Sequence, residues 1–234
     1  MQKNLKAIFF DMDGVLYDSM PFHAIAWVEA MNANGLDFTK QDVYLNEGRT
    51  GKAVIKEAFE KLGVEESYEG YIDDLCQKIY AEKSAWFNNL CPDGAKPMSG
   101  IHDVLNYLKR NNIQCWVVTG SGQKSLLDRL NRDFPGIFID DQAVRVISSF
   151  DVTHGKPDPE PYLKAWERSG FDKKDCMVIE NAPLGIRAGK AADLFSVAVN
   201  TGILPDKVLT DEGADMVFKS MQDLLNWLNQ TRAV

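Results

Sequence analysis

The segment that most constrains this chain is the apolar run Ala7-Ile8-Phe9-Phe10, which is followed at once by Asp11-Met12-Asp13-Gly14. A uniformly apolar run without polar alternation is typical of a strand buried on both faces, as in a parallel sheet covered by helices. The two aspartates then follow the carboxyl end of the strand, where parallel α/β sheets build their binding sites. Carboxylates held this close repel each other, and a hard cation such as Mg²⁺ relieves that repulsion. A turn that merely ends the strand is the alternative.

A second polar loop follows the apolar stretch from Cys115 to Val118. It reads Thr119-Gly120-Ser121-Gly122, so it offers a hydroxyl group and glycine-flanked backbone N–H groups. Such a loop at a strand end can hold phosphate oxygens. By itself, a Thr-Gly-Ser-Gly sequence is more often an ordinary loop.

Two further segments supply a cation and oxygen ligands. Lys156 lies in Gly-Lys-Pro-Asp-Pro, where two prolines restrict the backbone and so fix where the ammonium group points. A cation placed in this way stabilises charge on a phosphoryl group during transfer. Glu180 and Asn181 follow the apolar run Met177-Val178-Ile179, and Pro183 is predicted to open a helix after them. Taken singly, Lys156 would be a surface lysine and Glu180 an acid at a helix N-terminus.

The pattern between these motifs predicts the fold class. Apolar residues recur at helical spacing in three stretches, near residues 24–31, 55–62 and 72–79. From residue 97 onward, helical patterns alternate with β-rich runs at 115–118, 144–148, 177–180 and 195–199, and a helix closes the chain. We therefore predict an α/β fold with a doubly wound, Rossmann-like parallel sheet and an inserted all-helical cap domain. The predicted core comprises residues 1–16 and 92–234, and the cap comprises residues 17–91.

Composition narrows the class of protein. The 234 residues carry a net charge of −8 without a sustained basic run, which argues against nucleic acid or an anionic membrane as partner. No apolar stretch reaches the length of a membrane span, and the first six residues lead directly into a strand, so we expect neither a signal peptide nor a membrane anchor. The four cysteines lack zinc-site spacing. We expect a cytoplasmic protein that binds a small-molecule phosphate and is a monomer.

The four motifs together resemble those of the haloacid dehalogenase-like superfamily, which carries Asp-x-Asp, Thr or Ser, Lys and an acidic motif at successive strand ends. The match spans essentially the whole chain. The sequences from Phe10 to Ser19, Gly155 to Pro157 and Glu180 to Gly185 are similar to those of its β-phosphoglucomutase-like branch of phosphatases and mutases. This branch often has an acid where Asn181 stands. An asparagine still offers a neutral oxygen ligand but removes one negative charge.

The resemblance implies an aspartyl-phosphate mechanism. Asp11 would attack phosphorus, and Asp13 would protonate the leaving oxygen and then activate the incoming hydroxyl group. Lys156 and Thr119 would bind the transferring phosphoryl oxygens. Mg²⁺ would be held by the Asp11 carboxylate, the backbone carbonyl of Asp13 and a side chain of the fourth motif. Whether that side chain belongs to Glu180 or Asn181 stays open.

The predicted cap supplies candidate substrate-binding residues. In this family the cap closes over the site and confers specificity. Its polar loop leads into a helix and contributes five candidates, to which a histidine near the first cap helix and a lysine in the third are added. These residues are Glu47, Gly48, Arg49, Thr50, Lys52, His23 and Lys83. The alternatives are an exposed helix N-terminus capped by Thr50, a plain first-turn histidine and a solvated lysine.

The same loop separates two activities. In β-phosphoglucomutase, the corresponding loop resembles Lys-Gly-Val-Ser-Arg, and its basic residues hold a second phosphate. Here Glu47 and Gly51 align with those basic residues, while Arg49 and Lys52 lie nearby. We therefore expect a phosphohydrolase, with a mutase as the alternative. The loop is also similar to that of an inorganic pyrophosphatase of this branch, so pyrophosphate is a candidate substrate beside sugar and polyol phosphates. A non-catalytic phosphate-binding protein is the remaining alternative.

Overall fold

The computed structural model describes residues 4–63, 72–121 and 126–232. Within these residues it contains a six-stranded sheet in the order β3-β2-β1-β4-β5-β6, and every neighbouring pair is parallel. The strands are β1 (Ala7–Phe10), β2 (Gln114–Val118), β3 (Val146–Ile147), β4 (Cys176–Glu180), β5 (Phe195–Val199) and β6 (Met216–Phe218). This arrangement confirms the predicted doubly wound core.

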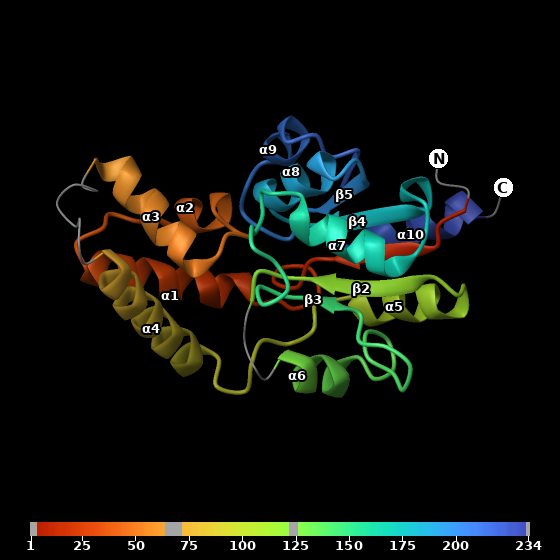
Figure 1. Ribbon diagram of the computed structural model, residues 1–234, viewed down its shortest axis with the longest axis horizontal. Helices are drawn as coiled ribbons and strands as arrows, with labels where there is room; N and C mark the ends of the chain where they lie inside the picture. The colour runs from red at the N-terminus through yellow and green to blue at the C-terminus, as the bar shows by residue number, and fades with distance from the viewer. Residues whose placement is uncertain (1–3, 64–71, 122–125, 233–234) are drawn as a thin grey trace.

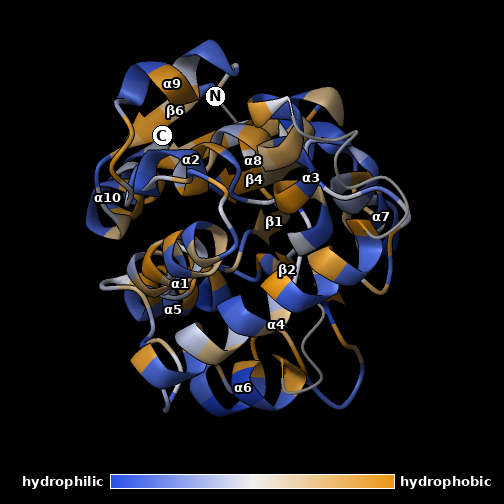
Figure 2. Ribbon diagram, turned by 90° about the vertical axis from the view of Figure 1, so that its left-hand side faces the viewer, coloured by the Kyte–Doolittle hydropathy of each residue, from blue (hydrophilic) through white to orange (hydrophobic). Residues whose placement is uncertain are grey.

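Helices connect the strands and form the inserted unit. The inserted helices are α1 (Met20–Ala33), α2 (Lys40–Leu45), α3 (Gly51–Leu62) and α4 (Ile72–Leu90). The helices of the core are α5 (Ile101–Arg110), α6 (Leu126–Asp133), α7 (Glu160–Ser169), α8 (Pro183–Ala191), α9 (Asp206–Asp211) and α10 (Met221–Arg232), with a 3₁₀ turn at Lys173–Asp175. Along the surface helices hydrophilic and hydrophobic residues alternate (Figure 2), because each helix buries only one face.

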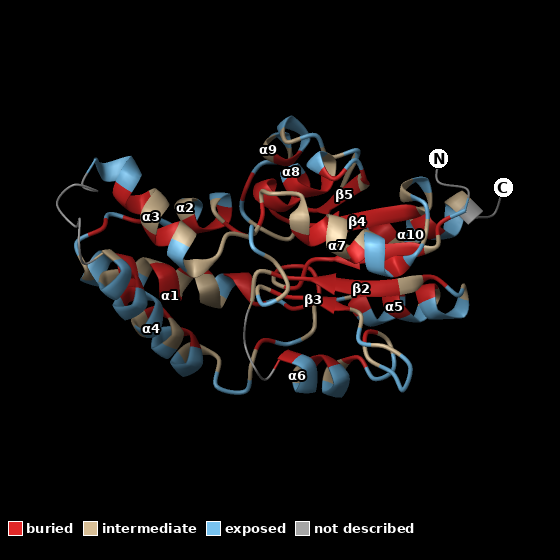
Figure 3. Cartoon of the chain, in the orientation of Figure 1, coloured by how far each residue is buried: buried red, intermediate tan, exposed pale blue. Residues whose placement is uncertain are grey.

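The sheet lies between two layers of helices (Figures 1 and 3). Ile8 and Phe10 of β1 face a core that contains apolar residues of α5, α6 and α10. Ala7 and Phe9 face the opposite core, which includes residues of α7 and α8. All four side chains are fully buried, so the uniformly apolar run reflects burial on both faces.

The inserted helices build a separate hydrophobic core. Trp27, Met31, Ile55, Phe59 and Ile79 are among its buried residues. Figure 1 shows these helices together at the end of the sheet toward which the strands point. The all-helical cap is therefore confirmed, while its boundaries at residues 17 and 91 stay a prediction. None of the helices in the described ranges is long and apolar enough to span a membrane.

Two linkers join the cap to the core and pair with each other. The amide of Asp18 donates to the carbonyl of Lys96 at 2.9 Å, and the amide of Met98 donates to the carbonyl of Leu16 at 2.8 Å. Tyr17 and Pro97 form an antiparallel bridge between them.

Several elements differ from the sequence prediction. The strand expected over residues 144–148 is only Val146–Ile147, and Val144 is half exposed. Strand β6 and helices α2, α6 and α9 were not predicted. These elements are short, and β6 is only partly buried, so their apolar pattern is weak.

Candidate active site

The register of the sheet brings the motifs to one edge. Phe10 pairs with Val117 of β2 and with Ile179 of β4, so β1 lies between the strands that precede the second and fourth motifs. The amide of Asp11 still donates to Ile179 at 2.9 Å, and the amide of Thr119 donates to Ile147 at 2.9 Å. The polar side chains that follow these positions therefore gather where parallel strands end.

Asp11, Lys156 and Glu180 form a buried ionic network. The Lys156 ammonium donates to Asp11 Oδ1 at 2.5 Å, to Glu180 Oε1 at 2.6 Å and to the carbonyl of Val118 at 3.0 Å. All three N–H donors of the lysine are thereby used. Both Lys156 and Glu180 are almost completely buried, so Lys156 is not the surface lysine of the alternative.

The charges in this network determine its protonation. Burial raises the pKa of the Asp11 carboxyl to about 8 against the opposing Lys156 charge, and the Glu180 carboxylate adds to the rise. Although burial lowers the pKa of Lys156, the two carboxylates hold it above its ordinary value. The lysine therefore stays an ammonium group, and Asp11 shares it with a competing carboxylate.

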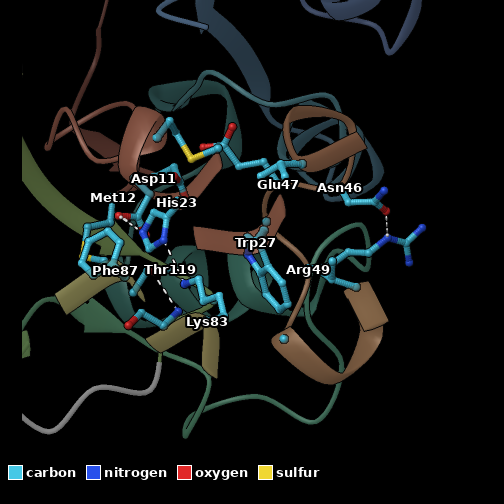
Figure 4. A pocket seen from close by; sticks show the side chains of 18 of the residues that line it. Asp11, Met12, His23, Trp27, Asn46, Glu47, Arg49, Lys83, Phe87 and Thr119 are labelled. Carbon is cyan, nitrogen blue, oxygen red and sulfur yellow. Dashed lines mark hydrogen bonds and ion pairs between the residues drawn. The ribbon is translucent and has the colours of Figure 1, made fainter. Parts of the chain in front are cut away.

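Asp13 contacts a chain of groups that reaches into the cap. Its Oδ1 accepts from the Ser19 hydroxyl at 2.5 Å and lies 3.3 Å from Nε2 of His23. Nδ1 of His23 lies 2.9 Å from the Lys83 ammonium (Figure 4). Because an ammonium group can only donate, Nδ1 accepts, so the ring proton is on Nε2, the nitrogen that lies near Asp13. Burial raises the pKa of Asp13, but His23 and Ser19 outweigh it and hold that pKa below its ordinary value.

Lys83 is buried rather than solvated. Its ammonium group lies 5.4 Å from the ring centre of Trp27 and 5.3 Å from that of Phe87. Burial lowers the pKa of Lys83 to about 8. Burial of the His23 ring, together with the Lys83 charge, lowers the pKa of His23 below its ordinary value. His23 and Lys83 both line the pocket that contains Asp13, so the alternative of a solvated Lys83 is wrong, while the roles of the two residues stay a prediction.

A pocket lies between the cap and the strand ends. Among its lining residues are ten of the predicted site residues, from both parts of the chain (Figure 4). These ten are Asp11, Asp13, His23, Glu47, Gly48, Arg49, Lys83, Thr119, Gly120 and Ser121.

The second motif lines this pocket from the core. Thr119 is buried, and its hydroxyl oxygen accepts from the amide of Ser121 at 3.0 Å. Gly120 lies against the cap, since a Cβ atom there would come within 3.2 Å of the Gly48 carbonyl oxygen. Gly122 lies outside the described residues.

The cap loop reaches the core through Glu47 and Gly48. Glu47 Oε1 accepts from the amide group of Asn181 at 2.9 Å. Burial and the Asp11 carboxylate raise the pKa of Glu47 well above its ordinary value, although Asn181 opposes the rise. Gly48 has a φ of 94°, and a Cβ there would lie 3.3 Å from the Lys156 side chain. A glycine is therefore required by both the backbone and the space.

The other predicted residues of this loop do not reach the pocket centre. Arg49 lines the pocket, but its guanidinium group donates to Asn46 and pairs with Glu57 at 3.3 Å, and Figure 4 shows it directed at Asn46. Thr50 is the N-cap of α3, which is the alternative given above for this residue. Lys52 is half exposed and pairs with Asp73 at 2.7 Å, outside this pocket.

Two buried atoms at this edge, Asn181 Oδ1 and Glu47 Oε2, have no hydrogen-bond partner among the described residues. Burying a polar atom without a hydrogen-bond partner costs stability unless a bound ligand supplies the missing contact. The described residues contain no group of three or more His, Cys, Asp or Glu side chains arranged to hold a metal. A hard cation here would therefore also use an amide or backbone oxygen, and the unpartnered Asn181 oxygen fits that requirement.

Two residues near the site were not predicted. Tyr162 of α7 is fully buried, and its hydroxyl donates to Glu180 Oε1 at 2.5 Å. Arg129 of α6 lines the pocket. The proline-rich segment before Tyr162 could have indicated a residue held near Lys156. Nothing in the sequence around Arg129 distinguishes it from Arg132.

Comparison with known proteins assigns the family. A model of the haloacid dehalogenase-like hydrolase family matches residues 5–193, so the chain belongs to this family. It is 27% identical to a phosphorylated carbohydrates phosphatase of Thermotoga maritima, over 97% of this chain and 99% of the relative. It is 29% identical to a beta-phosphoglucomutase of Bacillus subtilis, over 94% and 92% of the two chains.

A solved structure confirms the architecture. It is a "Putative beta-phosphoglucomutase" of Bacteroides vulgatus, 43% identical to this chain, and covers 99% of this chain and 90% of its own. The TM-score is 0.87. The resemblance to the β-phosphoglucomutase-like branch is therefore confirmed.

Proposed function

We propose that this protein is a Mg²⁺-dependent phosphohydrolase that acts on a small phosphorylated metabolite or inorganic pyrophosphate through an aspartyl-phosphate intermediate. The observation that carries the proposal is the buried Asp11 carboxyl group, which lies 2.5 Å from the Lys156 ammonium and lines a pocket with Asp13. A binding protein has no need of a nucleophile and a proton donor together.

The residues can be assigned roles in two displacements. Asp11 attacks phosphorus as the bond to the leaving oxygen breaks, and Asp13, in the protonated form in which the second displacement leaves it, delivers its proton to that oxygen. Water then attacks the phosphorus of the aspartyl phosphate and gives its proton to Asp13. This second displacement releases phosphate and restores Asp11. Thr119 binds the phosphoryl oxygens, and Lys156 stabilises their charge with the N–H donor that is freed from Asp11 when that carboxylate bonds to phosphorus.

The unpartnered Asn181 oxygen supports a metal site beside Asp11. Mg²⁺ would be held by the Asp11 carboxylate, the Asp13 carbonyl and Asn181, and would offset the negative charge of the phosphoryl group. We assign Asn181 rather than Glu180 as the side-chain ligand, because Glu180 Oε1 already accepts from Lys156 and Tyr162. The role of Glu180 is then to hold Lys156.

The cap loop favours hydrolysis over isomerisation. A mutase needs cations in the cap for the second phosphate of a sugar bisphosphate, but Lys52 is paired with Asp73 outside the pocket. Arg49 is turned toward Asn46 and Glu57. The charged cap-loop residue that contacts the core is instead Glu47. The mutase stays the alternative because a relative with that activity matches nearly the whole chain.

Glu47 further supports pyrophosphate as a substrate. Its second oxygen is buried without a partner, beside the proposed metal ligand Asn181. A carboxylate there can complete the shell of a metal-loaded diphosphate, whereas it repels a bare phosphate. We expect Glu47→Ala to lose pyrophosphate hydrolysis, while the matched variant Glu57→Ala, in the same cap, retains it. Intact pyrophosphate hydrolysis in Glu47→Ala, with unchanged Mg²⁺ dependence, would exclude this role.

The decisive experiment is phosphate release with Mg²⁺ from pyrophosphate, hexose 1- and 6-phosphates, polyol phosphates and phosphoglycolate, with Asp11→Asn as the control. Release that disappears in Asp11→Asn supports the hydrolase, and the best substrate identifies its specificity. Isomerisation of β-glucose 1-phosphate without net release would establish the mutase instead. Stoichiometric phosphate binding without turnover would establish a binding protein.

All four cysteines lie in the described residues, where no disulfide joins them, and three of them are buried core residues. This agrees with a reducing compartment, and we propose the cytoplasm as the site of action.

A further inference from the structure

Arg129 of α6 lies between the two linkers that join cap and core. Its guanidinium carbon is 3.6 Å from the ring centre of Tyr17, in the first linker. Its Nη2 donates to the carbonyl of Ala95, in the second linker, at 2.8 Å. A Cβ atom on Gly94 would lie 3.6 Å from the same guanidinium group. One side chain of the core thus contacts both connections to the cap.

An acidic residue on the same helix completes the contact. Asp133 Oδ2 accepts from the Tyr17 hydroxyl at 3.0 Å and lies 4.0 Å from Nε of Arg129. Tyr17 is fully buried. Burial raises the pKa of Tyr17 above its ordinary value, so its hydroxyl stays a hydrogen-bond donor. Helix α6 therefore contacts the first linker twice through Tyr17. Arg129 stacks on its ring, and Asp133 accepts a hydrogen bond from its hydroxyl group.

Movement of the cap must alter these contacts. The linkers are paired through the amides of Asp18 and Met98, so a rotation of the cap moves both linkers together relative to helix α6, which carries Arg129. Closure also places Glu47 on Asn181 and His23 beside Asp13. The geometry that keeps the linkers in place therefore also keeps these cap residues at the strand ends.

We propose that Arg129 is a positioning residue that clamps the two linkers and holds the cap in the closed arrangement. Its consequence for turnover rests on the proposed phosphohydrolase function. A guanidinium group suits this task because it is planar, and it can stack on an aromatic ring while it donates in its own plane. A lysine at this position would offer a point charge and would lack the planar group with its forked N–H donors.

Amide hydrogen exchange of the ligand-free protein tests the clamp without relying on activity. We expect Arg129→Ala to accelerate exchange of the Asp18 and Met98 amides about tenfold, because linker opening is no longer opposed by the stacked guanidinium. The amide of Asp11, bonded to Ile179 inside the sheet, serves as the internal reference and should not change. In activity assays the same variant should raise KM more than it lowers kcat.

Arg132→Ala is the matched control. Arg132 follows on the same helix and binds the same Asp133 at 2.8 Å, but it is largely exposed and donates to neither linker. Its replacement should leave the exchange of both linker amides unchanged. If Arg129→Ala does not fold, Arg129→Lys retains the charge without the planar group and should show a smaller acceleration of the same two amides.

Unchanged linker exchange in a folded Arg129 variant would overturn the clamp. If KM rose nevertheless, Arg129 would bind substrate directly from the pocket wall. If linker exchange accelerated while the wild-type protein hydrolysed no phosphate compound, the clamp would stand and the proposed function would fail. The two proposals can therefore be refuted separately.

Discussion

Replacement of Tyr162 by phenylalanine removes one hydroxyl group from the ionic network below the pocket. The hydroxyl donates to Glu180 Oε1 at 2.5 Å, and the same oxygen accepts from Lys156 at 2.6 Å. Tyr162 and Glu180 are both buried, so water cannot replace the lost hydroxyl donor. Burial and the Glu180 charge raise the pKa of Tyr162 well above its ordinary value, which keeps the proton on the hydroxyl.

The structure allows the loss to be estimated. A hydrogen bond to a charged acceptor contributes about 2 kcal/mol, and a neutral one contributes about 1 kcal/mol. We therefore expect Tyr162→Phe to lower the free energy of unfolding by about 2 kcal/mol in urea denaturation. Glu180 will also draw Lys156 more strongly away from Asp11, so kcat should fall about tenfold at unchanged KM.

Tyr107→Phe provides the comparison. The Tyr107 hydroxyl of α5 donates to the neutral carbonyl of Leu228 in α10 at 2.9 Å. Tyr107→Phe should lower the free energy of unfolding by about 1 kcal/mol and leave kcat unchanged. The reasoning is refuted if Tyr162→Phe loses no more stability than Tyr107→Phe and retains its kcat.

Three further predictions concern the same site. Because burial raises the pKa of Asp11 from 3.8 to about 8, the folded protein retains a proton that the unfolded chain has lost, and metal-free stability should fall as pH rises through this window. Asp11→Asn should flatten that slope, as measured by urea denaturation in a chelator at several pH values; an unchanged slope would show that another group carries it. Gly185→Ala would place a Cβ 2.0 Å from the Glu180 carboxyl carbon, and we expect it to lower the melting temperature more than Gly35→Ala, where a φ of 78° strains the backbone but no atom of the described residues lies within 4 Å. Lys83→Met should lower kcat/KM because His23 loses its partner at 2.9 Å, whereas Lys52→Met, at an exposed ion pair, should not; equal effects in steady-state assays would contradict these placements.

Motifs that are local in the chain could be predicted from sequence. The run of Ala7 to Phe10 indicated a strand buried on both faces because burial excludes polar alternation, and the structure has that strand at the centre of the sheet. Asp11, Thr119 and Asn181 then lie at one edge, because parallel strands bring their carboxyl ends together. Helix periodicity likewise identified the cap, since a helix must bury one face.

Tertiary structure decided what each polar side chain contacts. Glu47 and Lys52 are five residues apart on one loop and helix start, yet Glu47 reaches Asn181 while Lys52 reaches Asp73 in α4. Arg129 and Arg132 lie on one helix, but only Arg129 faces the linkers. Sequence spacing sets the direction of a side chain relative to its own helix, whereas its partner depends on which distant segment packs against that face. The chain by itself therefore determined the fold and the family of the site, and packing determined the charge pairs from which its chemistry is inferred.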